Sequence, residues 1–119
     1  MRTAPGANVQ QGEVAERVPR IARLMALALK FEQTVRQTLV PDYAVLAALG
    51  RVSRARVTQI MNLLNLAPDI QEQILFLTSE AAERHGVCEQ AIRRLSSLLL
   101  WSEQRAHWAA LMSKYGDRD

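Results

Sequence analysis

The chain has 119 residues, a length that suits one domain able to bury a hydrophobic core without metals or disulfides. Hydrophobic residues make up 49% of the chain, and no run of alternating polarity is bounded by turn residues, which argues against a β fold and predicts an all-α fold. The net charge of +3 is uneven, because residues 1–66 hold nine Lys or Arg against four Asp or Glu whereas residues 67–119 hold six against eight, so the first half suits a polyanion such as DNA.

The N-terminal part of the chain divides into an arm and a helix. Residues 1–17 contain proline, glycine and polar residues without hydrophobic periodicity, so we predict a flexible arm that is either a mobile remnant or an extension reaching along DNA. Apolar side chains then recur at helical spacing over residues 19–37, which predicts a first helix. The basic residues beside its apolar stripe are candidate phosphate contacts or else an ordinary solvated edge: Arg20, Arg23 and Lys30.

Residues 43–66 are predicted to form two short helices joined by a tight turn. Asp42 is the candidate N-cap of the first helix. Gly50 is expected to end that helix, because glycine enters the left-handed region without steric cost. Ser53 is the candidate N-cap of the second helix, which starts at the next residue. With the preceding helix, this pattern predicts a helix-turn-helix tri-helical core over residues 18–66.

The second of these helices has an apolar and a polar side on a helical wheel. Its polar side and cap carry the candidate base-reading residues: Ser53, Arg54, Ala55, Thr58, Gln59 and Asn62. Arg bonds bidentately to guanine, Gln or Asn bonds to adenine, and Thr or Ala contacts the thymine methyl in the major groove. Arg51 in the turn and Arg56 at the border of the face are further phosphate candidates. The alternative interpretation is a solvated polar face on an ordinary core helix.

These residues carry a resemblance to a known family. The stretch LAALGRVSRARVTQIMNLLNLAPDIQEQIL resembles the helix-turn-helix of the ParB and KorB DNA-binding proteins. The pattern W-x2-Q-x3-W, formed by Trp101, Gln104 and Trp108, is similar to one in small stand-alone helix-turn-helix proteins of bacterial mobile elements. The resemblance implies double-stranded DNA binding in transcriptional regulation, or an accessory role on a plasmid, phage or other mobile element. No stretch matches the nucleotide-binding boxes of ParB, so CTP-switched clamp sliding is not implied.

Residues 67–115 are predicted to form a helical extension of the core. We expect a short helix over residues 69–77 and a second over residues 79–85, capped by Ser79 and stopped by Gly86. Residues 88–115 have a helical pattern with an interruption near residues 96–100.

The final helix has an apolar face whose residues repeat over about two heptads. They either cover the core of their own chain or form a homodimer: Trp101, Trp108, Leu111, Met112 and Tyr115. Dimerisation would suit DNA binding, since helix-turn-helix proteins commonly pair to read two half-sites. In a rival hypothesis this helix binds a partner protein and the tri-helical core is only a scaffold.

Catalytic and metal-binding motifs are not found in the sequence. A zinc site needs about four ligands, and the chain offers only His85, Cys88 and His107 as His or Cys ligands. Phosphate-binding loops, nucleophile elbows and zinc-peptidase motifs are missing as well, so we expect no metal, no cofactor and no enzymatic activity.

Three features of the sequence bear on its compartment. The single cysteine excludes an intramolecular disulfide and fits a reducing cytoplasm. No signal peptide is visible, and no apolar run approaches the roughly 18 residues of a membrane span. The sequence therefore predicts a cytoplasmic, nucleoid-associated protein that binds a specific double-stranded DNA site.

Overall fold

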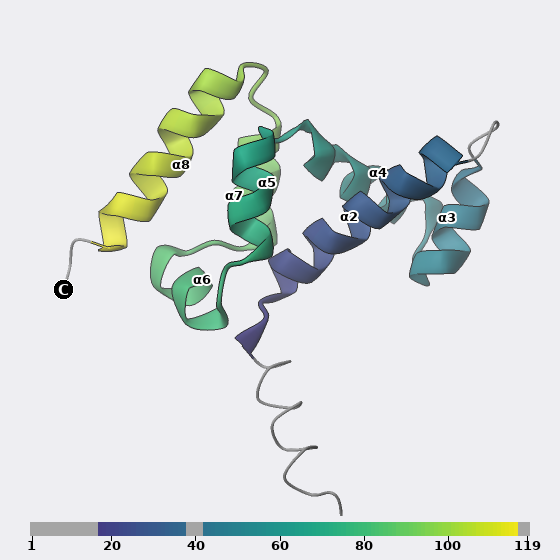
Figure 1. Ribbon diagram of the computed structural model, residues 1–119, viewed down its shortest axis with the longest axis horizontal. Coiled ribbons are helices and arrows are strands. Elements are labelled where there is room, and N and C mark those ends of the chain that lie inside the picture. Colours follow the sequence, from purple (N-terminus) through teal and green to yellow (C-terminus); the bar gives the residue numbers. More distant parts are fainter. Residues whose placement is uncertain (1–16, 38–41, 117–119) are drawn as a thin grey trace, which may run out of the picture.

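The computed structural model describes residues 17–37 and 42–116, with side chains described as far as residue 113, and these residues form helices and connections only. The elements in chain order are α2 (Arg20–Gln37), α3 (Tyr43–Gly50), α4 (Arg54–Met61), the 3-10 helix η1 (Asn62–Asn65), α5 (Pro68–Leu75), α6 (Ser79–His85), α7 (Glu89–Ser96) and α8 (Trp101–Gly116) (Figure 1). The predicted all-α fold class is confirmed. The arm predicted for residues 1–17 lies outside the described residues apart from Arg17. No described helix combines the length and the apolar character needed to cross a membrane.

Helix α2 is the element on which the N-terminal helices assemble. It follows Pro19, whose carbonyl accepts hydrogen bonds from the backbone N–H groups of Ala22 and Arg23. The helix buries a stripe of residues at helical spacing: Ile21, Ala22, Met25, Ala28 and Phe31. Helices α3, α4, η1 and α5 all contact α2. The first predicted helix is therefore confirmed with nearly the predicted bounds.

The predicted N-cap of α3 and its predicted end at Gly50 are confirmed, whereas the left-handed conformation predicted for Gly50 is wrong. The Asp42 carboxylate accepts a hydrogen bond of 2.8 Å from the Ala44 N–H. At the other end Arg51, and not Gly50, has the left-handed conformation, with φ 55°. The N–H of Val52 then donates to the Ala47 carbonyl over 3.0 Å, which closes the helix end.

Gly50 is explained by a close approach between helices. A Cβ atom built on Gly50 would lie 2.7 Å from Cζ of Phe31, a side chain of α2 that is fully buried. Carbon atoms do not approach this closely without displacement, so α3 can pack against α2 here only without a side chain. The sequence signal at this position was correct, but its cause is packing and not backbone conformation.

Helix α4 begins where the sequence predicts and ends earlier. The Ser53 hydroxyl accepts a hydrogen bond from the Arg56 N–H, and the helix starts at the residue after Ser53. After Met61 the chain tightens into η1. Leu63, which the helical wheel placed at the border of the apolar face, is buried, because the 3-10 helix puts residues three apart on one side and aligns Leu63 with buried Ile60.

Both of the next two predicted helices are present, but α5 is shifted toward the N-terminus and ends two residues early, and α6 has a different N-cap residue. Helix α5 starts with Pro68 at its first turn, one residue before the predicted start, and ends at Leu75. The N-cap of α6 is Thr78 and not the predicted Ser79, since the Thr78 hydroxyl accepts a hydrogen bond from the Ala81 N–H. Gly86 ends α6 with φ 67°, as predicted.

The predicted interruption of the last helical stretch is confirmed. Helix α7 ends at Ser96 and α8 starts at Trp101, so residues 97–100 connect them. Helix α8 contacts α6 and α7. In Figure 1, α8 and α3 lie at opposite ends of the molecule, with α5 and α7 between them. The buried residues of α4 and Trp108 of α8 belong to one hydrophobic core cluster.

Candidate nucleic-acid interface

The polar side of α4 is open to solvent. Every predicted base-reading residue on it is exposed: Ser53, Arg54, Ala55, Thr58, Gln59 and Asn62. The opposite side carries Val57 and Ile60, which are buried. No hydrogen bond or ion pair within the described residues engages the guanidinium of Arg54. The structure therefore places these side chains together on one accessible surface.

The buried side of α4 belongs to the main hydrophobic core. Val57 and Ile60 lie in the same cluster as Phe31 of α2 and Leu46 of α3. Helices α2, α3 and α4 contact one another pairwise. This packing fixes the orientation of the exposed face, because a rotation of α4 would bring polar side chains into the core.

Arg56, predicted as a phosphate contact, has its guanidinium engaged by groups of the protein itself. Its guanidinium donates from both terminal nitrogens to the Glu89 carboxylate at the start of α7, with 2.8 Å between Nη2 and Oε1. The same Nη1 donates over 2.9 Å to Oε1 of Gln59. Arg56 thus joins α4 to α7 and orients a base-reading candidate, a role that the sequence pattern did not predict.

The Arg56–Glu89 pair is partly buried, and positive charges outnumber negative charges around it. Hydrogen bonding to Arg56 lowers the pKa of Glu89, and the positive charges of Arg93 and Arg20 lower it further. The same hydrogen bonding raises the pKa of Arg56. One carboxylate therefore lies among three guanidinium groups, which leaves this part of the surface with an excess of positive charge.

The remaining phosphate candidates are all exposed: Arg20, Arg23, Lys30 and Arg51. The positive charge of Arg20 contributes to the lowered pKa of Glu89, the partner of Arg56. Arg51 lies in the turn immediately before the cap of α4. For Arg23 and Lys30 the described side-chain contacts give exposure alone, and nothing in them brings these two residues to the face of α4.

A polar hollow extends this surface onto α7. Its walls are formed by side chains from α4, η1 and α7: Gln59, Asn62, Asn65, Arg93, Ser96 and Ser97. Asn65 and the α7 residues were not identified from the sequence. Their only local signal is the i, i+4 spacing of Glu89 and Arg93, which marks a helix surface but not its neighbour.

The W-x2-Q-x3-W pattern serves to dock α8. Gln104 is fully buried; its Oε1 accepts a hydrogen bond of 2.7 Å from the Ala67 N–H, and its Nε2 donates to the carbonyls of Asn65 and Leu98. The Trp101 indole also donates to the Asn65 carbonyl, over 3.2 Å. The Trp108 indole donates to Oε1 of Gln73, over 2.7 Å, and its ring is buried. All three residues therefore hold α8 against η1 and α5.

An ion pair on the surface joins the same elements. Arg105 of α8 forms a bidentate pair with Asp69 at the start of α5, and hydrogen bonding to Arg105 lowers the pKa of Asp69. Of the residues predicted to form a dimer or a core, Trp108 is in the core, and Leu111 and Met112 are half-buried against it. The side chain of Tyr115 lies outside the described residues.

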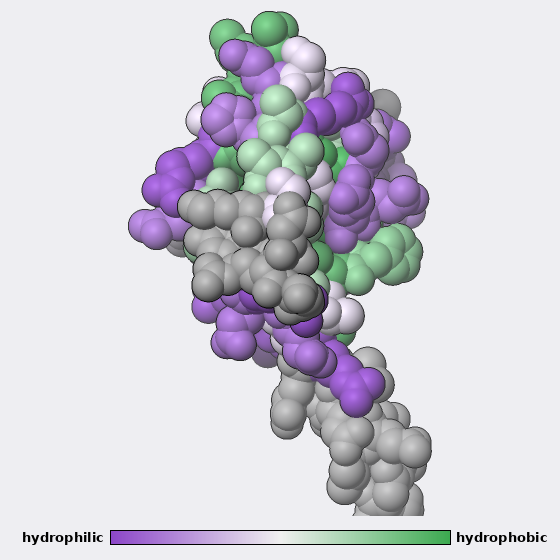
Figure 2. Space-filling view, turned by 90° about the vertical axis from the view of Figure 1, so that its left-hand side faces the viewer, coloured by the Kyte–Doolittle hydropathy of each residue, from purple (hydrophilic) through white to green (hydrophobic). Residues whose placement is uncertain are grey.

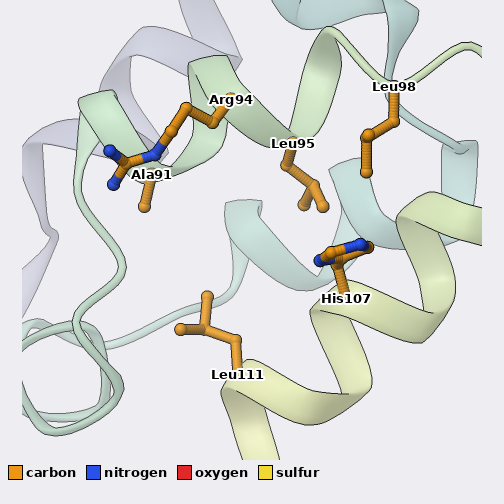
Figure 3. A pocket seen from close by; sticks show the side chains of 6 residues that line it. All are labelled: Ala91, Arg94, Leu95, Leu98, His107 and Leu111. Atoms are coloured by element: carbon orange, nitrogen blue, oxygen red, sulfur yellow. The ribbon is translucent and has the colours of Figure 1, made fainter.

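An apolar pocket of about 370 Å³ separates α7 from α8, lined by Ala91, Arg94, Leu95, Leu98, His107 and Leu111 (Figure 3). The connection next to it is strongly exposed, with 93% of Leu99, 59% of Leu100 and 47% of Trp101 accessible to solvent. Figure 2 shows hydrophobic surface at the upper end of the face that carries α8, where Figure 1 places this connection. This patch is the second surface of the molecule with the character of a binding site.

Within residues 17–37 and 42–116, no three His, Cys, Asp or Glu side chains cluster in a way that could hold a metal ion. Cys88 is exposed, and His85, the last residue of α6, is buried. Comparison of the chain with protein-family models, curated proteins and solved structures gives no match.

Proposed function

We propose that the protein is a sequence-specific double-stranded DNA-binding protein in which α3, the turn and α4 act as a helix-turn-helix. In this proposal α4 enters the major groove and its N-terminal residues meet the base edges. The observation that carries the proposal is the division of α4: its apolar side is buried, and the six candidate residues on its polar side and at its two ends are exposed.

The chemistry of the exposed surface supports this function. Arg54 can bond bidentately to guanine, Gln59 to adenine, and the Thr58 methyl can contact thymine. Gln59 is held by Arg56, so less side-chain entropy is lost when it binds a base. An ordinary solvated helix face does not require this combination of an unpaired arginine, amides and a hydroxyl around a small alanine.

The charge around α4 supports contact with the phosphate backbone. Arg51 precedes its cap, and Arg20 lies near the Arg56–Glu89 pair. Such contacts set the register and orientation of a protein on DNA, whereas base contacts set its sequence preference. The excess of basic residues in residues 1–66 agrees with this placement.

The biological role that we propose follows the resemblance to ParB and KorB proteins and to small proteins of mobile elements. Occupancy of a specific site would regulate transcription, or assist a reaction on a plasmid, phage or other mobile element. This role places the protein with the nucleoid in the cytoplasm. It needs no cofactor and no catalytic residue, because site occupancy alone accounts for both outcomes.

Selection of bound sites from a random duplex library tests the proposal. We expect an enriched motif, steep loss of affinity with added salt, and loss of motif preference in Arg54→Ala. Arg84→Ala is the matched control, because Arg84 is an exposed arginine on α6. Equal affinity for all duplexes, or equal losses in the two variants, would contradict sequence-specific binding through α4.

The exposed patch of Leu99, Leu100 and Trp101 supports a second candidate function, a protein interaction site with the other helices as scaffold. A second copy of the chain is the partner to test first, since paired helix-turn-helix proteins read two half-sites. We expect Leu99→Ser with Leu100→Ser to halve the mass measured by light scattering at micromolar concentration. A wild-type mass equal to one chain would contradict self-association.

A further inference from the structure

We infer that the DNA contact surface continues from α4 onto α7, where Arg93, together with Asn65 of η1, contacts the phosphate backbone beside the groove that α4 enters. This inference rests on the proposed function and adds residues that the sequence pattern did not identify. It begins from the polar hollow between α4, η1 and α7.

The walls of the hollow come from α4 and η1 on one side and from α7 on the other. Near the start of both helices, Arg56 of α4 is paired with Glu89 of α7. Further along, Gln59 and Asn62 share the hollow with Arg93 of α7. The Arg56–Glu89 pair therefore fixes α7 at a set distance from the proposed base-reading face, and a duplex seated on α4 would pass over the residues of the second wall.

The chemistry of the hollow suits a phosphate group. Its lining contains one guanidinium, three carboxamides and two serine hydroxyls, and no carboxylate is among the lining residues. The Ser96 and Ser97 hydroxyls donate to carbonyls of their own helix, so Arg93 and the amides are the available donors. Phosphate oxygens are the acceptors that guanidinium and amide donors bind most often at protein–DNA surfaces.

Arg93 is free to take such a partner. Its guanidinium lies 3.7 Å from Glu89, a carboxylate that already accepts two hydrogen bonds from Arg56. Its side chain is 43% exposed, against 21% for that of Arg56. A weak, exposed ion pair is worth little in water, so exchanging Glu89 for a phosphate would cost Arg93 little.

Asn65 is held in place by α8. Its backbone carbonyl accepts hydrogen bonds from the Trp101 indole and from Nε2 of Gln104, whereas its side chain is exposed at the hollow. The docking of α8 therefore positions a donor of the proposed phosphate contact. Helix α8 would in this way contribute to DNA binding although it does not itself contact DNA.

The neighbouring residue Arg94 is a matched control. Consecutive residues of a helix point about 100° apart, and Arg94 lines the pocket between α7 and α8 and not the polar hollow (Figure 3). Both arginines are exposed, carry the same charge and occupy the last turn of α7. Arg93→Gln and Arg94→Gln therefore change the net charge and the helix end equally.

The test measures the affinity of the full chain for its selected duplex and for a random duplex over a range of salt concentrations. We expect Arg93→Gln to weaken both by a similar factor, roughly three- to tenfold at 0.1 M salt, and to reduce the salt slope by about 0.9. Asn65→Ala should weaken both without changing the slope, because no charge is removed. Arg94→Gln should match the wild type more closely than Arg93→Gln in affinity and slope.

The possible failures are distinguishable. Equal effects of Arg93→Gln and Arg94→Gln, with Arg54→Ala still losing the selected site, would overturn the contact on α7 and leave the proposed function intact. A loss confined to the selected duplex would also overturn it, since it would indicate base recognition. If the wild-type chain binds no duplex, both proposals fail. Matching circular dichroism spectra and melting temperatures establish that the variants are folded.

Discussion

The Glu89 carboxylate accepts hydrogen bonds from both terminal nitrogens of Arg56, and this pair is the side-chain link between α4 and α7. It orients Gln59 on one side and leaves Arg93 with a partner that is already satisfied on the other. The pair thus connects the face of α4 predicted from the sequence with the surface on α7 that only the fold brings beside it.

We expect Glu89→Gln to lower the free energy of unfolding by about 1–2 kcal/mol at neutral pH, because the variant leaves the partly buried Arg56 without a charged partner. The pKa of Glu89 is lowered in the folded protein, so its contribution is present above the usual glutamate pKa, about 4.3, and is lost as the pH falls through the lower folded value. Urea unfolding at neutral pH and below pH 4 measures this. Glu83→Gln, an exposed glutamate on α6, is the control. A difference between the two variants that persists at low pH would contradict the assignment.

Gly50→Ala should destabilise the protein by about 1–3 kcal/mol, because the new methyl group would lie against the buried ring of Phe31. Thermal unfolding followed by circular dichroism measures the loss. Combining the change with Phe31→Leu should recover part of it, since the smaller side chain leaves room near Cζ. Additive losses in the double variant would show that packing against Phe31 is not the reason for glycine.

Arg51→Gly should raise the stability by about 0.5–1 kcal/mol, because Arg51 adopts φ 55° at the end of α3 and glycine does so without a steric penalty. The expectation is opposite in sign to that for its neighbour Gly50, which makes the two substitutions a direct test of which residue has the left-handed conformation. If Arg51→Gly destabilised the protein, the left-handed conformation would belong elsewhere in the turn.

Gln104→Ala should cost about 2–4 kcal/mol, because it leaves the buried Ala67 N–H and two carbonyls without their partner and opens a cavity. Both tryptophans of the chain lie on α8, so intrinsic fluorescence reports on the docking of this helix. We expect a red shift of the emission in the variant. Gln90→Ala, at an exposed position of α7, should leave stability and emission unchanged.

Arg20→Gln should weaken binding to selected and random duplexes by a similar factor and reduce the salt slope by about 0.9, as the loss of one phosphate contact does. Arg36→Gln is its control on the same helix, because Arg36 lies at the opposite end and is paired with Glu32. Fluorescence anisotropy at several salt concentrations measures both. A loss limited to the selected duplex would place Arg20 at a base and not at a phosphate.

Sequence reasoning succeeded where the signal is local. Asp42, Ser53 and Gly86 were predicted as helix ends, and each acts within a few residues of its own position. The exposed side of α4 was also predicted correctly, since helical periodicity alone divides its buried and exposed residues.

The errors and omissions involve partners that are distant in sequence. Gly50 was assigned to a turn conformation because its real constraint, the ring of Phe31, belongs to another helix. The Arg56–Glu89 pair and the hydrogen bonds of Gln104 to Asn65 and Ala67 join residues more than thirty positions apart. Of the three hydrogen bonds of Gln104, the one to the Leu98 carbonyl is the exception. No local pattern encodes such pairings, so Arg93 and Asn65 could be placed beside α4 only from the fold.

The backbone carbonyl of Asn65 links α8 to the end of the α4 surface. It receives donors from Trp101 and Gln104 while its own side chain lies at the end of the α4 surface. A molecule that bound the Trp101 indole and displaced it from this carbonyl would loosen η1, the segment that follows the proposed base-reading face of α4. Thermodynamic reciprocity then requires that a duplex bound to Asn65 change the protein's affinity for that molecule by the same factor by which the molecule changes the affinity for the duplex. The α4 surface and the exposed patch of the α7–α8 connection would in this way communicate through a single peptide group.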